Sequence, residues 1–153
     1  MAQSLAKNLI HLVFSTKNRE RFIADAIRPH LHAYMGTVLK NVKSPSLLIN
    51  SVEDHVHVLF SLHRTKALSD VVGDLKASSS KWIKTQSSDL ATFGWQGGFG
   101  AFSISESNVP AVRAYIENQR EHHSKVSFQD EMRAFLKFLK KHGVEYDERY
   151  LWD

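Results

Sequence analysis

Apolar residues in this chain follow two spacings in turn, and the order of these spacings constrains the fold more than any other sequence feature. Short apolar runs, which are typical of strands, occupy residues 9–15, 46–52, 55–63 and 101–105. After the first and third runs, apolar residues recur at steps of three and four, which predicts amphipathic helices. The order β-α-β-β-α-β is typical of the ferredoxin-like split βαβ arrangement. We therefore expect an α+β fold, an antiparallel sheet with helices packed on one face and additional C-terminal helices.

Helix caps and breakers refine these expectations. The predicted helical segments are about 23–41, 68–83, 108–123 and 127–143. Pro29 marks either the true start of the first helix or a kink in it. Ser69 is a candidate cap for the second helix, and Ser107 or Asn108 for the third. The last segment, 145–153, is expected to pack back on the domain or on a partner because it carries aromatic and leucine side chains.

Composition excludes several classes of protein. The 153 residues suit one domain, 1–153, with a core of its own. The lack of cysteine excludes disulfide scaffolds, thiolate zinc sites and cysteine nucleophiles. No apolar run approaches the ~20 residues that cross a bilayer, so we expect a cytoplasmic protein. The net charge of +4 and the isoelectric point of about 9.4 favour a nucleic-acid or phosphate partner.

Two histidines alternate with valines in the third apolar run. His55 and His57 are two residues apart, so in a strand both imidazoles point to one face while Val56 and Val58 point to the other. Two imidazoles on a rigid strand can hold a divalent metal ion. The same pattern also suits two polar residues on a half-solvated strand, and it does not by itself decide between these interpretations.

A tyrosine and a glutamine lie four residues apart on the third predicted helix. Tyr115 and Gln119 therefore share one helix face, ~6 Å apart along the axis. With two imidazoles, the Gln119 oxygen would make an open metal shell that leaves room for water and phosphate oxygens and suits Mg²⁺ or Mn²⁺. In the alternative, Tyr115 packs against its own helix and Gln119 faces water.

Three segments together resemble a known family of enzymes. They are DHVHVLF at 54–60, WQGGFGAFSIS at 95–105 and VRAYIENQ at 112–119. In these segments, and over essentially its whole length, the chain resembles the HUH-type (His-hydrophobic-His) single-tyrosine transposases of the insertion-sequence 200/605 family. The histidine pair alone is unspecific, whereas its combination with the Tyr-Ile-Glu-Asn-Gln helix is typical of this family.

The resemblance implies a role for each of these residues. His55, His57 and Gln119 would bind the divalent metal, Mg²⁺ or Mn²⁺, and Tyr115 would be the catalytic nucleophile. The implied activity is that of a DNA transposase that cuts and rejoins single-stranded DNA at hairpin-bearing element ends through a 5′-phosphotyrosine intermediate. The implied assembly is a homodimer in which the tyrosine helix of one chain serves the histidine pair of the other.

Basic side chains on the second and third helices are the candidate DNA contacts, because cationic groups bind the phosphate backbone. They are Lys76, Lys81, Lys84, Arg113 and Arg120.

Three other functions remain compatible with the sequence. One is a non-catalytic or domesticated protein of ferredoxin-like fold that binds single-stranded nucleic acid. Another is a replication-initiator nickase that uses the same chemistry. The third is a metal hydrolase that activates water and would not need Tyr115.

Overall fold

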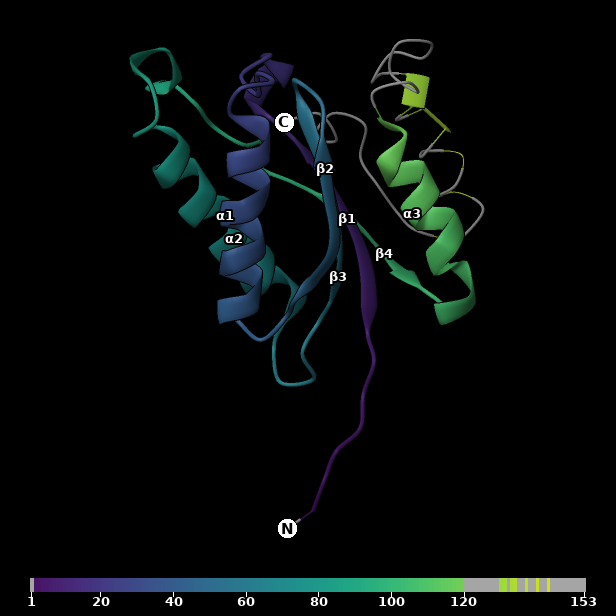
Figure 1. The fold of residues 1–153 in the computed structure, drawn as a ribbon. Helices are drawn as coiled ribbons and strands as arrows, with labels where there is room; N and C mark the ends of the chain where they lie inside the picture. Colours follow the sequence, from purple (N-terminus) through teal and green to yellow (C-terminus); the bar gives the residue numbers. More distant parts are fainter. Residues whose placement is uncertain are drawn as a thin grey trace.

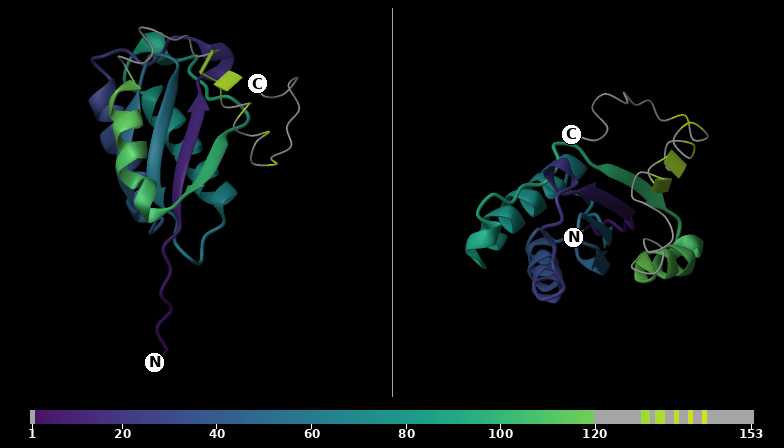
Figure 2. Two further views of the ribbon diagram at one scale, coloured as in Figure 1. Left: turned by 90° about the vertical axis from the view of Figure 1, so that its right-hand side faces the viewer. Right: turned by 90° about the horizontal axis from the view of Figure 1, so that it is seen from above.

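The computed structural model describes residues 2–119 together with 130, 131, 133, 134, 137, 140 and 143. These residues contain a four-stranded antiparallel sheet with helices on both sides (Figure 1). α1 (Arg28–Asn41) and α2 (Leu68–Ile83) cover one face, and α3 (Val109–Glu117) lies against the other (Figure 2). The element order β-α-β-β-α-β followed by α3 confirms the predicted α+β class.

The sheet has the strand order β2-β3-β1-β4. Its strands are β1 (Leu9–Ser15), β2 (Ser46–Ser51), β3 (His55–Ser61) and β4 (Gly100–Ile104). β1 and β3 are central, and Val13 of β1 lies opposite His57 of β3. β2 and β3 form an antiparallel pair joined by a short turn that holds Glu53 and Asp54, as the sequence predicts.

The face of the sheet below α1 and α2 is apolar. On β3, Val56, Val58 and Phe60 point to this face, and none of them is exposed to solvent. Tyr34 and Trp82 stack with ring centroids 5.0 Å apart and join the two helices. The helices complete this core with Leu31, Met35, Leu39, Val71, Val72, Leu75 and Ile83. Burial of these side chains is the main source of stability in the fold.

The helix ends differ in part from the sequence predictions. α1 begins at Arg28 rather than near residue 23, with Pro29 in its first turn, where the missing N–H costs nothing. Ser69 is not the cap of α2, because the helix begins one residue earlier and Ala67 occupies the cap position. Asn108 is at the N-cap of α3 as predicted, but its side chain makes no capping hydrogen bond.

α3 ends at Glu117 instead of running unbroken to His123. Asn118 leaves the helical conformation, and Gln119 is helical again. Residues 120–129, which include Arg120 and the predicted start of the fourth helix at Ser127, lie outside the described residues. The helix boundary therefore falls between Tyr115 and Gln119.

The described positions of the predicted fourth helix are helical at residues 130, 131, 133, 134, 137 and 140. Gly143 follows in a turn with φ of +70°, a left-handed conformation that suits glycine at a helix end. The segment 144–153 lies outside the described residues. Within the part of the chain that the structure describes, no helix combines the length and apolar character needed to cross a membrane.

Candidate metal and tyrosine site

The two histidines of β3 project from the sheet face that α3 covers. The side chains of His55 and His57 are 0% exposed. Their ring centroids lie 5.2 Å apart, so the alternation of β3 places both imidazoles on one face, as predicted. The intervening Val56 points into the apolar core on the other side. One strand thus supplies both the core and the histidine pair.

Two hydrogen bonds hold α3 against β2 and bring Tyr115 to the histidines. Asn50, which lies opposite His57 in the sheet, donates from Nδ2 to the backbone carbonyl of Ile116 at 2.7 Å. Arg113 donates from Nη1 to a backbone carbonyl of β2 at 3.2 Å. The Tyr115 ring centroid consequently lies 5.6 Å from that of His57. Tyr115 therefore meets the histidine pair of its own chain.

A buried carboxyl group completes this cluster. Glu131 is 4% exposed and accepts a hydrogen bond from the Tyr115 hydroxyl at Oε1. Its Oε2 lies 3.6 Å from His55 Nε2, and its Oε1 lies 3.6 Å from His57 Nε2. Two imidazoles, one phenol and one carboxyl group from three separate parts of the chain therefore meet at one point.

Each imidazole also has a hydrogen-bond partner behind it. His55 Nδ1 lies 2.8 Å from Asp54 Oδ1, and His57 Nδ1 lies 2.9 Å from Nε2 of His11 on β1. Because Nδ1 is engaged in both rings, Nε2 is the atom that each ring directs toward Glu131. Such outer hydrogen bonds are what orient histidine ligands around a metal.

Burial shifts the pKa values of two groups in the site. Burial raises the pKa of Glu131 from 4.5 to about 8, and the negative charge of Asp54 adds to the effect. Burial lowers the pKa of His11 from 6.5 to about 4, so this ring is neutral near pH 7. A carboxylate in such surroundings is stabilised by a nearby positive charge. The cluster is therefore suited to a cation.

The donor set fits a divalent metal ion. One ligand atom from each of His55, His57 and Glu131 lies within 4.8 Å of the others, and all three residues are buried. Imidazole nitrogen together with carboxylate oxygen is a common ligand set for divalent transition metals such as Mn²⁺. These three residues could thus bind a metal ion.

Gln119 lies four residues after Tyr115, beyond the end of α3, and is fully buried. Its Nε2 donates to the backbone carbonyl of Tyr115 at 3.0 Å. That hydrogen bond engages the amide nitrogen, so a ligand role would use the amide oxygen. Metal binding by Gln119 stays a prediction.

Comparison with known proteins assigns the chain to a family. A family model described as "Transposase IS200 like" matches residues 4–119, which include the histidine pair and Tyr115. The chain belongs to the IS200-like transposase family. A direct comparison with curated proteins gave no match. Membership in this family supports an enzymatic role in DNA transposition.

Two solved structures share the fold of this IS200-like transposase. A candidate transposase from Deinococcus radiodurans R1 has 20% sequence identity and a TM-score of 0.61, covering 78% of this chain and 98% of that one. A REP-associated tyrosine transposase bound to a REP hairpin has 14% identity and a TM-score of 0.58, covering 82% of this chain and 74% of that one. At these identities the likeness concerns the fold.

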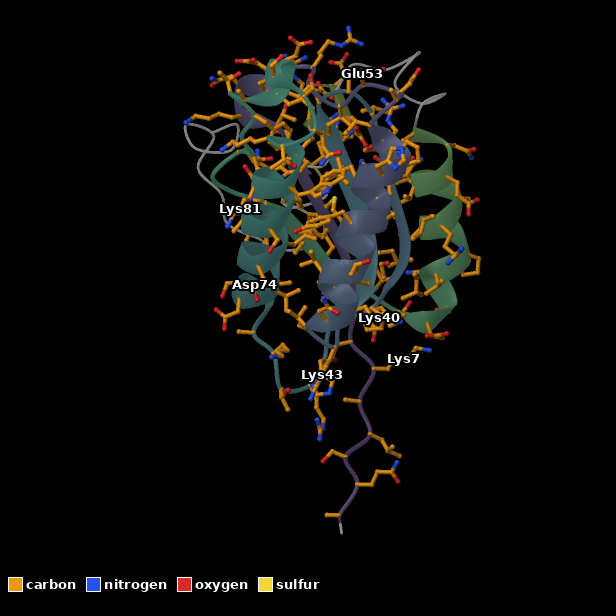
Figure 3. The ribbon with its side chains drawn as sticks, turned by 60° about the vertical axis from the view of Figure 1, so that its left-hand side comes forward. Lys7, Lys40, Lys43, Glu53, Asp74 and Lys81 are labelled. Carbon is orange, nitrogen blue, oxygen red and sulfur yellow. The ribbon has the colours of Figure 1, made fainter. Side chains whose placement is uncertain are left out.

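Three of the predicted DNA contacts of the transposase lie away from the histidine pair. Lys76 and Lys81 belong to α2 and Lys84 directly follows it, on the opposite side of the sheet from α3. Figure 3 shows Lys81 on that side. Lys76 donates to two backbone carbonyls of the glycine-rich loop before β4, at 2.9 and 2.6 Å, and burial lowers its pKa to about 8. Arg113 ties α3 to β2. Contacts of these residues with DNA stay predictions, as does that of Arg120.

Sequence reasoning did not single out His11, Asp54 and Glu131. His11 lies in an apolar run that is typical of a strand buried on both faces, and its shared face with His57 follows only from the strand register. Asp54 directly precedes the histidine pair, which is the signal that could have identified it. Glu131 belongs to a helix whose docking position no local pattern specifies.

Proposed function

We propose that this transposase cuts and rejoins single-stranded DNA by transesterification, with Tyr115 as the nucleophile. The observation that carries the proposal is the meeting of the half-buried Tyr115 phenol with the buried side chains of His55, His57 and Glu131 in one cluster. Membership in the transposase family supports this chemistry. A water-activating hydrolase would have no use for a phenol held at that position.

In the proposed reaction, one phosphoester is exchanged for another. The Tyr115 oxygen attacks a DNA phosphorus, the 3′ oxygen leaves and takes up a proton, and a 5′-phosphotyrosine forms. Attack by a 3′-hydroxyl on that phosphotyrosine rejoins DNA and releases the phenol. Because bond energy is conserved, the reaction needs no nucleotide, in keeping with a sequence that has no Gly-x-x-x-x-Gly-Lys-Ser/Thr loop.

The phenol needs help from the site, because a tyrosine with a pKa of ~10 is only ~0.1% ionised near pH 7. Glu131 orients the nucleophile by accepting its hydrogen bond. We propose that His55, His57 and Glu131 hold Mg²⁺ or Mn²⁺, with Gln119 as a further ligand. When bound, the metal stabilises negative charge on the phosphate oxygens. The buried position of the cluster would also limit access of competing water.

The proposed substrate is DNA with hairpin-bearing ends, and the neighbour bound to a REP hairpin supports it. We propose that residues 1–153 act as one cytoplasmic transposase domain and form a homodimer, as the family resemblance implies. Since Tyr115 meets the histidine pair of its own chain, a dimer with shared sites would exchange this contact for the same contact between chains.

A covalent-adduct assay tests the proposal. Wild-type protein, Mn²⁺ and single-stranded DNA from the flanks of its own gene should give a protein–DNA adduct that survives denaturation, and Tyr115→Phe should give none. Tyr34→Phe is the matched control, because Tyr34 stacks on Trp82 in the other helix layer and should leave the adduct unchanged. An adduct in Tyr115→Phe would refute the assignment of the nucleophile, and metal-dependent cleavage without an adduct would favour a hydrolase.

A further inference from the structure

We infer that His11 is a positioning residue for the metal site: it accepts a hydrogen bond from Nδ1–H of His57 and so keeps the Nε2 lone pair of His57 directed at the metal position. The inference rests on the proposed function, because it assigns a task within the same site.

The strand register brings the two rings together. Val13 lies opposite His57, so His11, two residues earlier on β1, is the diagonal neighbour of His57 on the same face. His11 Nε2 lies 2.9 Å from His57 Nδ1, and the ring centroids are 5.2 Å apart. His11 is only 6% exposed, so water has little access to this hydrogen bond.

Two neutral imidazoles can share this hydrogen bond in two ways. If His11 donated, His57 would carry its own proton on Nε2 and could not bind a metal through that atom. If His57 donates from Nδ1, its Nε2 carries the lone pair. Only the second arrangement gives a metal-binding nitrogen on the side where Glu131 lies 3.6 Å away.

The neighbouring histidine shows the same design with a different partner. His55 Nδ1 faces the carboxylate of Asp54 at 2.8 Å, and a carboxylate only accepts hydrogen bonds. His55 therefore donates from Nδ1 and presents the lone pair of Nε2 to Glu131. His11 accepts the Nδ1–H hydrogen bond of His57 as Asp54 accepts that of His55, but the neutral His11 ring adds no negative charge.

His11 also touches the nucleophile. Its ring meets that of Tyr115 edge-on, with centroids 6.1 Å apart. The same side chain therefore contacts both a proposed metal ligand and the proposed nucleophile. A substitution that keeps the shape of the ring but removes the acceptor separates the hydrogen bond from this packing.

The experiment compares His11→Phe, which removes the acceptor, with His11→Gln, which restores one. Long-range ¹H–¹⁵N spectra of metal-free protein report which nitrogen of His57 carries the proton. We expect Nδ1–H in the wild type and in His11→Gln, and a shift toward Nε2–H in His11→Phe. Mn²⁺ affinity, followed by electron paramagnetic resonance, should fall about tenfold or more in His11→Phe and recover in His11→Gln. His32→Phe, which removes a histidine bound to Ser51 outside the site, should change neither measurement.

Two results would overturn the inference. One is Nε2–H on His57 in the wild type, which needs no variant to fold. The other is a His11→Phe protein with the wild-type tautomer and Mn²⁺ affinity. Because the tautomer is measured without metal or DNA, a wild type that forms no tyrosine adduct would refute the proposed function and leave the tautomer result intact.

Discussion

On β3, Val56, Val58 and Phe60 face α1 and α2, whereas the alternate residues His55 and His57 face α3. The first face is closed by aliphatic and aromatic contacts. The second holds buried imidazoles and a buried carboxyl group together with the half-buried phenol of Tyr115. The two faces share their strands and differ in the chemistry of the side chains that they hold.

The comparison shows how stability and chemistry are divided in this fold. Burial of apolar groups drives folding, whereas burial of a carboxyl group opposes it, as the raised pKa of Glu131 indicates. Because the site is carried on β1 and β3, the central strands, the apolar face holds the polar one in position. Substitutions on the apolar face should therefore lower the free energy of unfolding, whereas substitutions among the site residues should lower DNA cleavage.

The largest expected effect comes from replacing one residue on each face of β3. His57→Ala should lower metal-dependent DNA cleavage about a thousandfold or more, because metal stabilisation of the phosphate is worth several kcal/mol. Hairpin binding should stay within a few fold. Phe60→Ala should instead lower the free energy of unfolding by about 3–5 kcal/mol, measured by urea denaturation. Equal loss of hairpin binding and cleavage in His57→Ala would identify it as a folding defect and break the comparison.

A smaller effect is expected from Glu131→Gln, which keeps the shape of the side chain and removes its charge. Mn²⁺ affinity should fall about tenfold or more, measured by titration. The melting temperature of the metal-free protein at pH 8 should not fall, because the desolvated carboxylate is gone. Glu117→Gln, an exposed change on α3, serves as the control. Unchanged Mn²⁺ affinity in Glu131→Gln would remove this residue from the metal site.

The smallest effect concerns a titratable group of the apolar side. Burial, together with the charge of Arg28, lowers the pKa of His32 from 6.5 to about 4. The folded state favours the neutral ring, so its stabilising contribution is present above pH 6.5 and is lost as the pH falls toward 4. His32→Gln should therefore reduce the loss of stability between pH 6.5 and 4, followed by urea denaturation at each pH, and exposed His30→Gln should not. If the stability of His32→Gln fell with pH as steeply as that of the wild type, the loss could not be assigned to His32.

The apolar face could be predicted from the sequence, and the polar face only in part. Spacing alone located the four strands and the helices between them, because periodicity reports which side chains are buried. The alternation of His55 and His57 placed both rings on one face. The partnership of His11 with His57 depends on the register between two strands. Contact of Glu131 with the pair depends on tertiary docking, which no local pattern encodes.

The four strands in the described part of the chain end by Ile104, whereas Tyr115 and Glu131 come later in the sequence. A protein emerges from the ribosome N-terminus first, so the strands that carry His11, His55 and His57 emerge before Tyr115. A growing polypeptide would thus contain all the described strands before it contains the proposed nucleophile. In the proposed chemistry, a partly synthesised chain therefore lacks the nucleophile and does not cleave DNA.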